Sequence, residues 1–171
     1  EQRDLLSITY PVTNSSTAQP YAPGSLPYAI QQANASDGRD TIRIMDISNS
    51  GNFPDEGSHK KISIYSKLPT ITEGATIETE SGDLVVLKDE NVSSGFSALE
   101  IDIDWTGHSV YSTWVLIYDL QFANFGGSGT FAVDVNETYD TNGTLNRLYI
   151  QECSFDAALN ASGDLVGSGI D

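Results

Sequence analysis

Short apolar runs with a period of two residues recur along the chain and restrict what it can fold into. Ile62 and Ile64 alternate with polar neighbours, and so do Leu99, Ile101 and Ile103. Because successive side chains of a strand point to opposite faces, this pattern buries one set of residues and exposes the other. Clusters of Gly, Asn, Asp and Ser separate the runs, as turns require. The sequence therefore predicts a mostly β protein.

One segment has the spacing of a helix instead. Its apolar residues are Leu26, Ala29, Ile30 and Ala33. Ser25 is suited to the N-cap position, Pro27 is tolerated in the first turn, and Gly38 can close the C-terminal end. We expect one short amphipathic helix over residues 25–35.

An eight-residue segment recurs 33 residues later without gaps, because residues 115–122 (VLIYDLQF) align with residues 148–155 (LYIQECSF). The matched pairs include Asp119 with Glu152, Leu120 with Cys153, and Phe122 with Phe155. A strand, a corner and a second strand that repeat at a fixed period indicate a solenoid of stacked coils, with Cys153 facing the core. Two similar strands of a β-sandwich are the alternative interpretation.

The segment with helical spacing also resembles a known structural group. Residues 24–44 (GSLPYAIQQANASDGRDTIRI) are similar to the N-terminal cap of right-handed parallel β-helix surface proteins. In that group a short helix leads into Asp-Thr-Ile and the first strand. The runs at residues 62–64, 68–71 and 75–77 continue the resemblance. The group includes large secreted or surface-anchored proteins such as polymorphic outer-membrane-protein-like adhesins.

This resemblance implies an all-β fold, a right-handed parallel β-helix that forms a single domain over residues 1–171. Residues 1–40 would supply an N-terminal strand and the capping helix, and residues 41–171 would form the coils. A solenoid needs such a cap, because its first coil would otherwise expose a sheet edge and an open hydrophobic end. The resemblance also implies an extracellular or cell-surface setting.

Charge excludes two classes of partner. The chain has 24 Asp and Glu residues against 8 Lys and Arg residues, a formal net charge of −16. Such a surface repels phosphates, so we expect no binding to nucleic acid or to anionic membranes. No run approaches the roughly 18 apolar residues of a membrane-spanning helix, so we expect no transmembrane segment. The one cysteine excludes an intrachain disulfide.

The sequon Asn-x-Ser/Thr occurs six times, so six of the ten Asn residues belong to one. These residues are Asn14, Asn34, Asn91, Asn136, Asn142 and Asn160. Sequons accept N-linked glycans on exposed loops of exported proteins. The alternative is that turns rich in Ser, Thr and Asn produce sequons by chance. Both interpretations fit polar loops, and we expect an extracellular or cell-surface glycoprotein.

The segment 99–104 carries the densest polar pattern. If its apolar residues face the core, then Glu100, Asp102 and Asp104 face outward, about 6.6 Å apart along the strand. A row of carboxylates can bind Ca²⁺, which takes six to eight oxygen ligands. The same carboxylates could act as acid and base on a polysaccharide. The simplest interpretation is a solvated acidic face, so calcium is the one cofactor that the sequence suggests.

We expect a non-catalytic structural or adhesive protein that assembles end to end into a filament or surface matrix. In this hypothesis an N-terminal strand or cap covers the last coil of the next chain. The contact residues would be Leu5, Ile8, Tyr10 and Val12 on one side, and Val166 and Ile170 on the other. Strand addition to an open edge is a known recognition mode, and a head-to-tail contact that does not close gives a filament. The expected partners are a second copy of the chain or a host or cell-surface glycan.

The alternative is a carbohydrate-binding or polysaccharide-degrading β-helix that uses Glu100, Asp102 and Asp104. A neutral polysaccharide would be its substrate, because a surface of −16 repels uronates. Trp105 and Trp114 flank a polar loop, where they could stack on sugar rings or pack beneath the loop.

Overall fold

The computed structural model describes residues 7–36, 38–45, 51–80, 85–90, 95–103, 114–125, 131–135, 148–156, 158–159, 165–166 and 168–170. It contains one helix, α1 (Leu26–Asn34), within these residues. The strands are β1 (Thr9–Val12), β2 (Asp40–Ile44), β3 (Asp55–Glu56), β4 (His59–Ile64), β5 (Ala75–Thr79), β6 (Val85–Asp89), β7 (Leu99–Ile101), β8 (Val115–Tyr118), β9 (Leu120–Ala123), β10 (Phe131–Val135), β11 (Leu148–Gln151), β12 (Ser154–Asp156), β13 (Ala158–Leu159), β14 (Leu165–Val166) and β15 (Ser168–Ile170).

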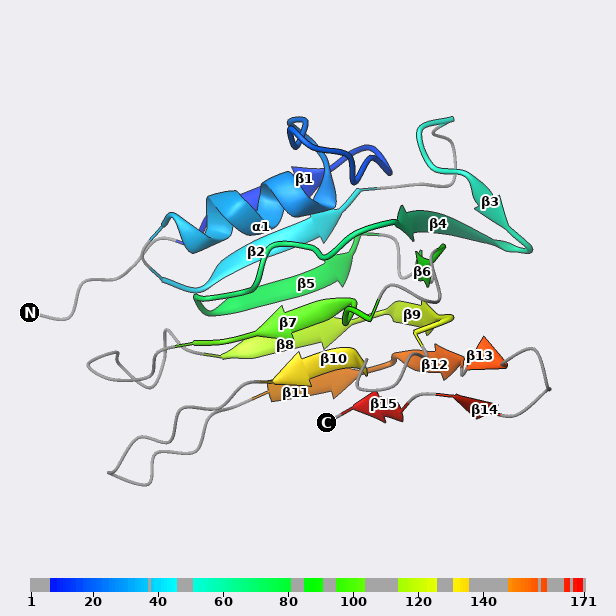
Figure 1. Cartoon of the computed structure of the whole chain (residues 1–171). Coiled ribbons are helices and arrows are strands. Elements are labelled where there is room, and N and C mark those ends of the chain that lie inside the picture. Colours follow the sequence, from blue (N-terminus) through cyan, green and yellow to red (C-terminus); the bar gives the residue numbers. More distant parts are fainter. Residues whose placement is uncertain are drawn as a thin grey trace, which may run out of the picture.

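Most strands belong to three sheets that stack the chain upon itself (Figure 1). Sheet A has the order β1-β2-β5-β8-β11, sheet B the order β12-β9-β6-β4-β3, and sheet C the order β15-β10-β7. The pairs β3–β4 and β13–β14 are antiparallel, and the other strand pairs of the described chain are parallel. The chain passes from sheet A to B to C and returns to A one level further along. This path makes a β-solenoid of about three turns and confirms the predicted parallel β-helix.

We call each level of the stack a coil, and the path from coil 1 to coil 4 makes the three turns. Coil 1 contains β2, β4 and the bridge of Ile71 to Ile101; coil 2 contains β5, β6 and β7; coil 3 contains β8, β9 and β10; and coil 4 contains β11, β12 and β15. The repeat found in the sequence is the stacking of coil 4 on coil 3, because Val115 pairs with Leu148 and Phe122 pairs with Phe155. The β-sandwich alternative is therefore wrong.

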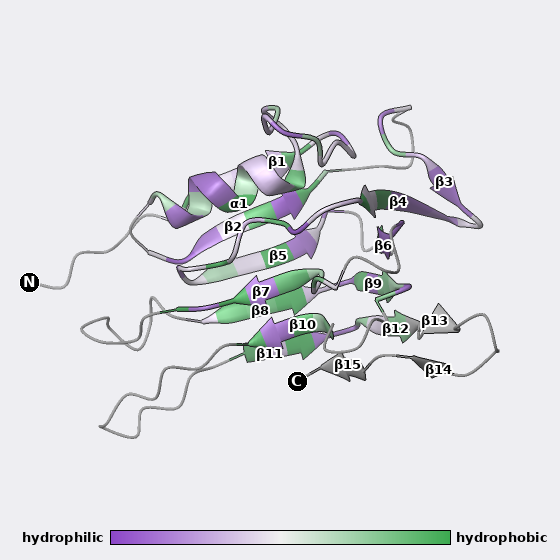
Figure 2. Ribbon diagram, viewed as in Figure 1, coloured by the Kyte–Doolittle hydropathy of each residue, from purple (hydrophilic) through white to green (hydrophobic). Residues whose placement is uncertain are grey.

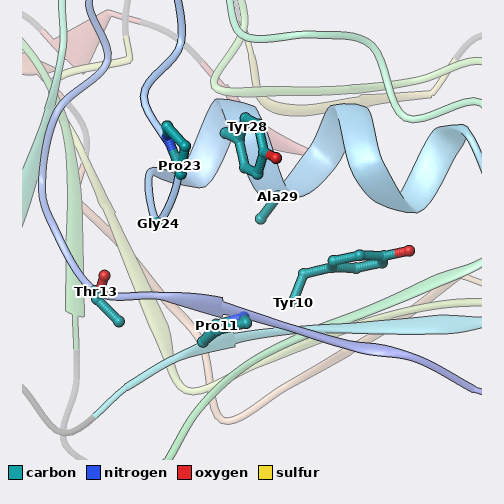
Figure 3. Close-up of a pocket in the computed structure, with 7 residues that line it drawn as sticks. All are labelled: Tyr10, Pro11, Thr13, Pro23, Gly24, Tyr28 and Ala29. Atoms are coloured by element: carbon teal, nitrogen blue, oxygen red, sulfur yellow. The ribbon is translucent and has the colours of Figure 1, made fainter.

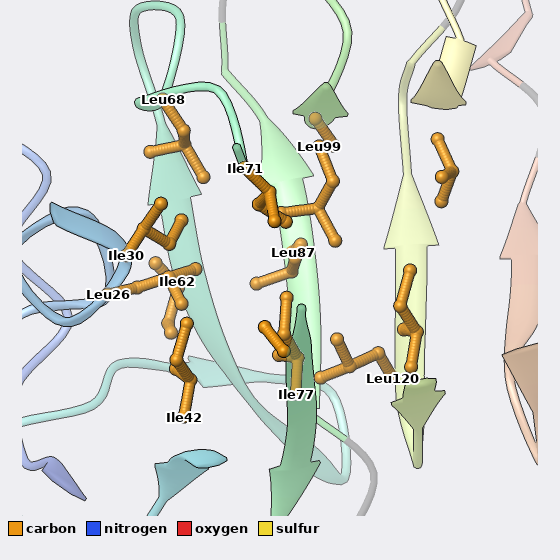
Figure 4. Packing of buried hydrophobic residues seen from close by; sticks show 14 of the residues in the cluster. Leu26, Ile30, Ile42, Ile62, Leu68, Ile71, Ile77, Leu87, Leu99 and Leu120 are labelled. Carbon is orange, nitrogen blue, oxygen red and sulfur yellow. The ribbon is translucent and has the colours of Figure 1, made fainter. Parts of the chain in front are cut away.

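Apolar side chains form columns that run through the coils inside the solenoid. In sheet A the register aligns Ile42, Ile77, Ile117 and Ile150, and in sheet B it aligns Ile62, Leu87, Phe122 and Phe155. The last two rings stack with centroids 5.2 Å apart and an interplanar angle of 6°. Figure 4 shows how the interior side chains of successive coils meet, and Figure 2 shows hydrophobic and hydrophilic residues alternating along the strands.

The helix α1 covers one end of this core. Leu26 and Ile30 are fully buried and face the interior beside Ile42 and Ile62 (Figure 4). The predicted N-cap is confirmed, because the Ser25 hydroxyl accepts a hydrogen bond from the backbone N–H of Tyr28 at 3.3 Å. The capping helix predicted from the sequence is therefore present, and it shields the open end of the apolar columns.

The prediction that Gly38 closes the helix is wrong. The helix ends at Asn34, and its C-cap is Ala35, whose backbone N–H donates to the carbonyls of Ala33 and Gln32. Gly38 follows three residues later with a φ of +118°. In the described part of the chain, no helix is both long enough and apolar enough to span a membrane.

Candidate functional site

The acidic strand β7 presents its side chains as predicted. Leu99, Ile101 and Ile103 are buried, whereas Glu100 is partly exposed and Asp102 is exposed. Asp104 lies outside the described residues. Among the residues that are described, no group of three or more His, Cys, Asp or Glu side chains is arranged to hold a metal ion. Calcium binding on this face therefore remains a prediction.

Glu100 forms an ion pair, with its carboxylate 2.5 Å from the ammonium of Lys67. This contact joins coil 1 to coil 2 on the side of sheet C. The equivalent contact on sheet A joins Arg43 of β2 to Glu78 of β5 at 2.6 Å. The register places these two residues directly opposite each other, so the pair fastens neighbouring strands.

Sheet B carries a larger ion-pair network around Glu56 of β3. Its carboxylate contacts Lys88 at 2.7 Å and Lys61 at 3.1 Å, and Lys61 also contacts Glu90 at 2.9 Å. Hydrogen bonds from Lys88 and Lys61 lower the pKa of Glu56, and the hydrogen bond from Lys61 lowers the pKa of Glu90. Hydrogen bonds to Glu90 and Glu56 raise the pKa of Lys61. Coil 1 is thus joined to coil 2 by ion pairs on all three sheets.

A different contact joins coil 3 to coil 4 at the corner between sheets A and B. Asp119 and Glu152 each lie at the corner with a positive φ, 56° and 53°, and they occupy equivalent places in the repeat. Burial raises the pKa of Asp119, and the nearby Glu152 carboxylate raises it further. A hydrogen bond to Glu152 also raises the pKa of Tyr118. The corner therefore holds an acidic pair in which protonated Asp119 can donate to Glu152.

Aromatic side chains also cross between coils on sheet A. Trp114 lies next to Tyr149, with ring centroids 5.7 Å apart, and the guanidinium of Arg39 lies 5.6 Å from the Trp114 centroid. Gly74 occupies the intervening coil between Arg39 and Trp114 and has no side chain to separate them. Trp114 therefore packs between coils, and its two predicted roles, stacking on a sugar ring or packing beneath the loop, remain predictions. Trp105 lies outside the described residues.

The residues predicted to mediate assembly fall into different environments. Ile8 is 45% exposed, Tyr10 is partly buried against the core and Val12 is fully buried. Val166 belongs to β14 and Ile170 to β15, whereas Leu5 lies outside the described residues. The proposed contact joins two copies of the chain, and the assembly hypothesis remains a prediction.

The outer edge of β1 is modified by a proline. The backbone N–H groups of Thr41 and Met45 in or beside β2 donate to the carbonyls of Ile8 and Val12, at 2.8 and 2.9 Å. Because alternate residues of a strand bond to the same neighbour, Pro11 has its backbone groups on the opposite, outer edge. Proline has no N–H, so this edge presents a carbonyl acceptor there without the matching donor.

A pocket of about 390 Å³ lies between this outer edge and α1, and we call it the cap pocket. Its lining residues are Tyr10, Pro11, Thr13, Pro23, Gly24, Tyr28 and Ala29. Figure 3 shows Tyr28 and Ala29 projecting from α1 on one side, and Tyr10 and Pro11 from β1 on the other. The lining consists mostly of rings and carries no group that is charged at neutral pH. Pockets of this size with an aromatic lining and a few polar groups are typical of small-ligand sites.

Two of the six sequon residues are described, and both make hydrogen bonds through their side-chain amides. Asn14 donates to the carbonyl of Pro23 at 3.2 Å. Asn34 donates to the carbonyl of Thr70 at 2.7 Å and accepts from the backbone N–H of Thr72 at 3.0 Å. The other four sequon residues, Asn91, Asn136, Asn142 and Asn160, lie outside the described residues. Glycosylation therefore remains a prediction, and Asn34 has a structural role as well.

Sequence reasoning missed the cap pocket, because it depends on how α1 lies over β1. The acidic corner was visible in the sequence, because Asp119 and Glu152 align in the repeat. The sequence did not reveal that Asp119 is buried. Comparisons of the chain with protein-family models, with curated proteins and with solved structures found no match.

Proposed function

We propose that the chain is a non-catalytic, extracellular β-helix with a structural or adhesive role. The observation that carries this proposal is the set of ion pairs that joins coil 1 to coil 2 on sheets A, B and C. Solenoids offer long fixed surfaces for binding, and cross-coil pairs on every face favour a stiff scaffold. The resemblance of the cap to polymorphic outer-membrane-protein-like adhesins supports the same role, and the six sequons support an extracellular location.

The non-catalytic part of the proposal is supported by the state of the acidic strand. The carboxylate of Glu100 contacts the ammonium of Lys67 at 2.5 Å, so this acid takes part in a contact between coils. A neutral-polysaccharide hydrolase that uses Asp102 is the second candidate. Release of reducing ends from neutral glycans, with loss of that activity in Asp102→Asn, would support the hydrolase and contradict our proposal.

The structural role is tested by light scattering of the purified chain over a hundredfold range of concentration. We expect the molar mass to grow from 18.4 kDa into open-ended polymers. The variant Ile8→Asp places a charge on an exposed apolar residue of the proposed contact and should stop this growth. The matched control is Tyr65→Asp, because Tyr65 is 63% exposed and lies outside the proposed contact. A constant monomer mass contradicts self-assembly.

The adhesive role is tested separately by retention of the fluorescently labelled chain on beads that carry neutral polysaccharides. Beads that carry polyuronate are the control, because repulsion by the charge of −16 should prevent retention there. Equal retention on both surfaces, or none on either, contradicts a specific adhesive role.

A further inference from the structure

The cap pocket combines features that narrow the chemistry of its ligand. Tyr10 and Tyr28 line it from β1 and α1, and Pro11 and Pro23 add to its apolar lining (Figure 3). Its polar groups are the tyrosine hydroxyls, the Thr13 hydroxyl and backbone groups at the outer edge of β1. The ligand must therefore match apolar faces and hydrogen-bonding groups at the same time.

An added peptide strand fits poorly at Pro11, the part of this edge that lines the pocket, whereas the proposed self-assembly would begin at the exposed residue Ile8. Strand addition depends on a regular series of backbone donors and acceptors, and Pro11 interrupts the series by removing a donor. What Pro11 leaves at the outer edge is a carbonyl, which accepts hydrogen bonds. A ligand that supplies donors, such as hydroxyl groups, satisfies this arrangement better than a second backbone does.

Charge excludes an anionic ligand. The pocket has no cationic side chain in its lining, and the chain around it has a net charge of −16. An anion would enter without a counter-charge and against the field of the protein. The lining also has no carboxylate to hold a cation. The ligand class that fits the pocket is therefore neutral, with hydroxyl donors around a compact apolar ring.

We propose that the cap pocket binds a neutral pyranose ring at the end of a glycan. The apolar face of the sugar would lie against Tyr28, and its hydroxyls would donate to the Pro11 carbonyl and to the Thr13 hydroxyl. This inference rests on the proposed adhesive function and names the ligand class through which adhesion would occur. A single ring in a shallow site should bind with a dissociation constant on the order of 1 mM.

The test is a titration of the isotope-labelled full chain followed by amide NMR spectra. The probes are glucose, galactose, mannose and N-acetylglucosamine, with glucuronate as the anionic control and a proline hexapeptide as the competing ligand class. We expect at least one neutral sugar to shift the amides of Thr13 and Gly24 and of α1. Glucuronate should bind at least tenfold more weakly than the neutral sugar.

Two substitutions of Tyr28 test whether the sugar binds in the cap pocket. Tyr28→Ala should weaken binding at least tenfold, whereas Tyr28→Phe should retain much of it because the ring remains. The matched control Tyr65→Ala removes an exposed tyrosine outside the pocket and should leave the affinity unchanged. The spectrum of each variant also reports whether the chain remains folded. For a Tyr28→Ala chain that does not fold, Thr13→Phe serves as the second variant, because it fills the pocket from an exposed residue.

The outcomes separate this inference from the adhesive function. Retention on neutral polysaccharide that Tyr28→Ala does not reduce would overturn the pocket and leave adhesion intact. Sugar-dependent shifts in the pocket without retention on beads would support the pocket and contradict adhesion. Absence of sugar shifts, or shifts with the proline peptide alone, would overturn the proposed ligand.

Discussion

At the scale of single residues, two carboxyl groups on different levels of the solenoid have pKa values shifted in opposite directions. Asp119 is buried, and the charged groups that raise its pKa are themselves acidic. Glu56 instead lies between two lysines, and their hydrogen bonds lower its pKa. The two groups should therefore change the stability of the chain in opposite directions as pH changes.

We predict that Asp119→Asn stabilises the chain at neutral pH. The folded chain binds the Asp119 proton more tightly than the unfolded chain does, so the free energy of unfolding falls as pH rises above the ordinary value of 3.8. The variant should gain on the order of 1 kcal/mol at pH 7 and nothing at low pH. Asn also tolerates the positive φ at this corner. Urea denaturation at both pH values measures the effect.

Two further variants test whether the cause is the acidic pair. Glu152→Gln removes the partner and should give a smaller gain than Asp119→Asn, because the burial of Asp119 remains, and the double variant should add little beyond Asp119→Asn. Asp102→Asn is the control, because Asp102 is exposed and follows β7, which belongs to another sheet. An equal gain from Asp102→Asn would assign the effect to net charge.

We predict the opposite pH dependence for Glu56. Its pKa is lowered in the folded chain, so its stabilising contribution is present above the ordinary value of 4.5 and is lost as pH falls through the lowered value. Glu56→Gln should cost about 0.5 kcal/mol at pH 7, because its side chain is partly exposed, and nothing near pH 2. Asp55→Asn is the matched control, since Asp55 pairs with Lys60 but is 76% exposed. Equal losses from the two variants would count against Glu56 as the centre of the network.

At the scale of secondary-structure elements, an element was predictable from the sequence when the residues that define it are close together in the chain. The helix was predictable because Ser25, Pro27 and the spacing of the apolar residues all lie within it. Strand β7 was predictable because Leu99 and Ile101 alternate with acids. The short strand β3 was not predictable. Asp55 and Glu56 show no alternation of apolar and polar residues, and they pair with β4 only because the intervening turn brings the two strands together.

The position of the helix, unlike its existence, depends on distant residues. Asn34 at the end of α1 bonds to the backbone of residues 70–72, which belong to coil 1. No local pattern reveals this contact, because Asn34 belongs to a sequon and the sequon offers another explanation for it. The same reason explains why the cap pocket was missed, since it lies where α1 and β1 meet.

We predict that Asn34→Ala loosens α1 from the first coil. The change removes the hydrogen bonds to the Thr70 carbonyl and the Thr72 N–H, which should cost about 1 kcal/mol because both groups are accessible to water. Denaturant unfolding measures the loss, and hydrogen exchange should show faster opening of α1 than of β8. Gln31→Ala is the matched control on the exposed face of the same helix. If both variants lose the same stability, helix propensity rather than this contact explains the result.

At the scale of the whole molecule, charge is distributed unevenly along the solenoid. Residues 1–103 contain seven of the eight basic residues, and residues 104–171 contain nine acidic residues with one basic residue. Each of the six described basic residues contacts a carboxylate or an aromatic ring. Coils 1 and 2 are therefore joined by ion pairs, whereas coils 3 and 4 are joined by apolar columns and stacked rings.

This distribution predicts how salt and divalent cations act on the chain. Added salt weakens the ion pairs of coils 1 and 2, but it also screens the 16 acidic charges in excess, and the second effect should be larger. We expect the melting temperature to rise by a few degrees between about 10 and 200 mM NaCl.

Ca²⁺ and Mg²⁺ at equal concentration should raise the melting temperature by different amounts only if oxygen ligands form a specific site. A larger rise with Ca²⁺ that disappears in Asp102→Asn, but not in Asp55→Asn, would establish calcium binding by Glu100, Asp102 and Asp104. Equal effects of the two cations would assign the acidic strand to solvent, because screening alone does not distinguish ions of the same charge.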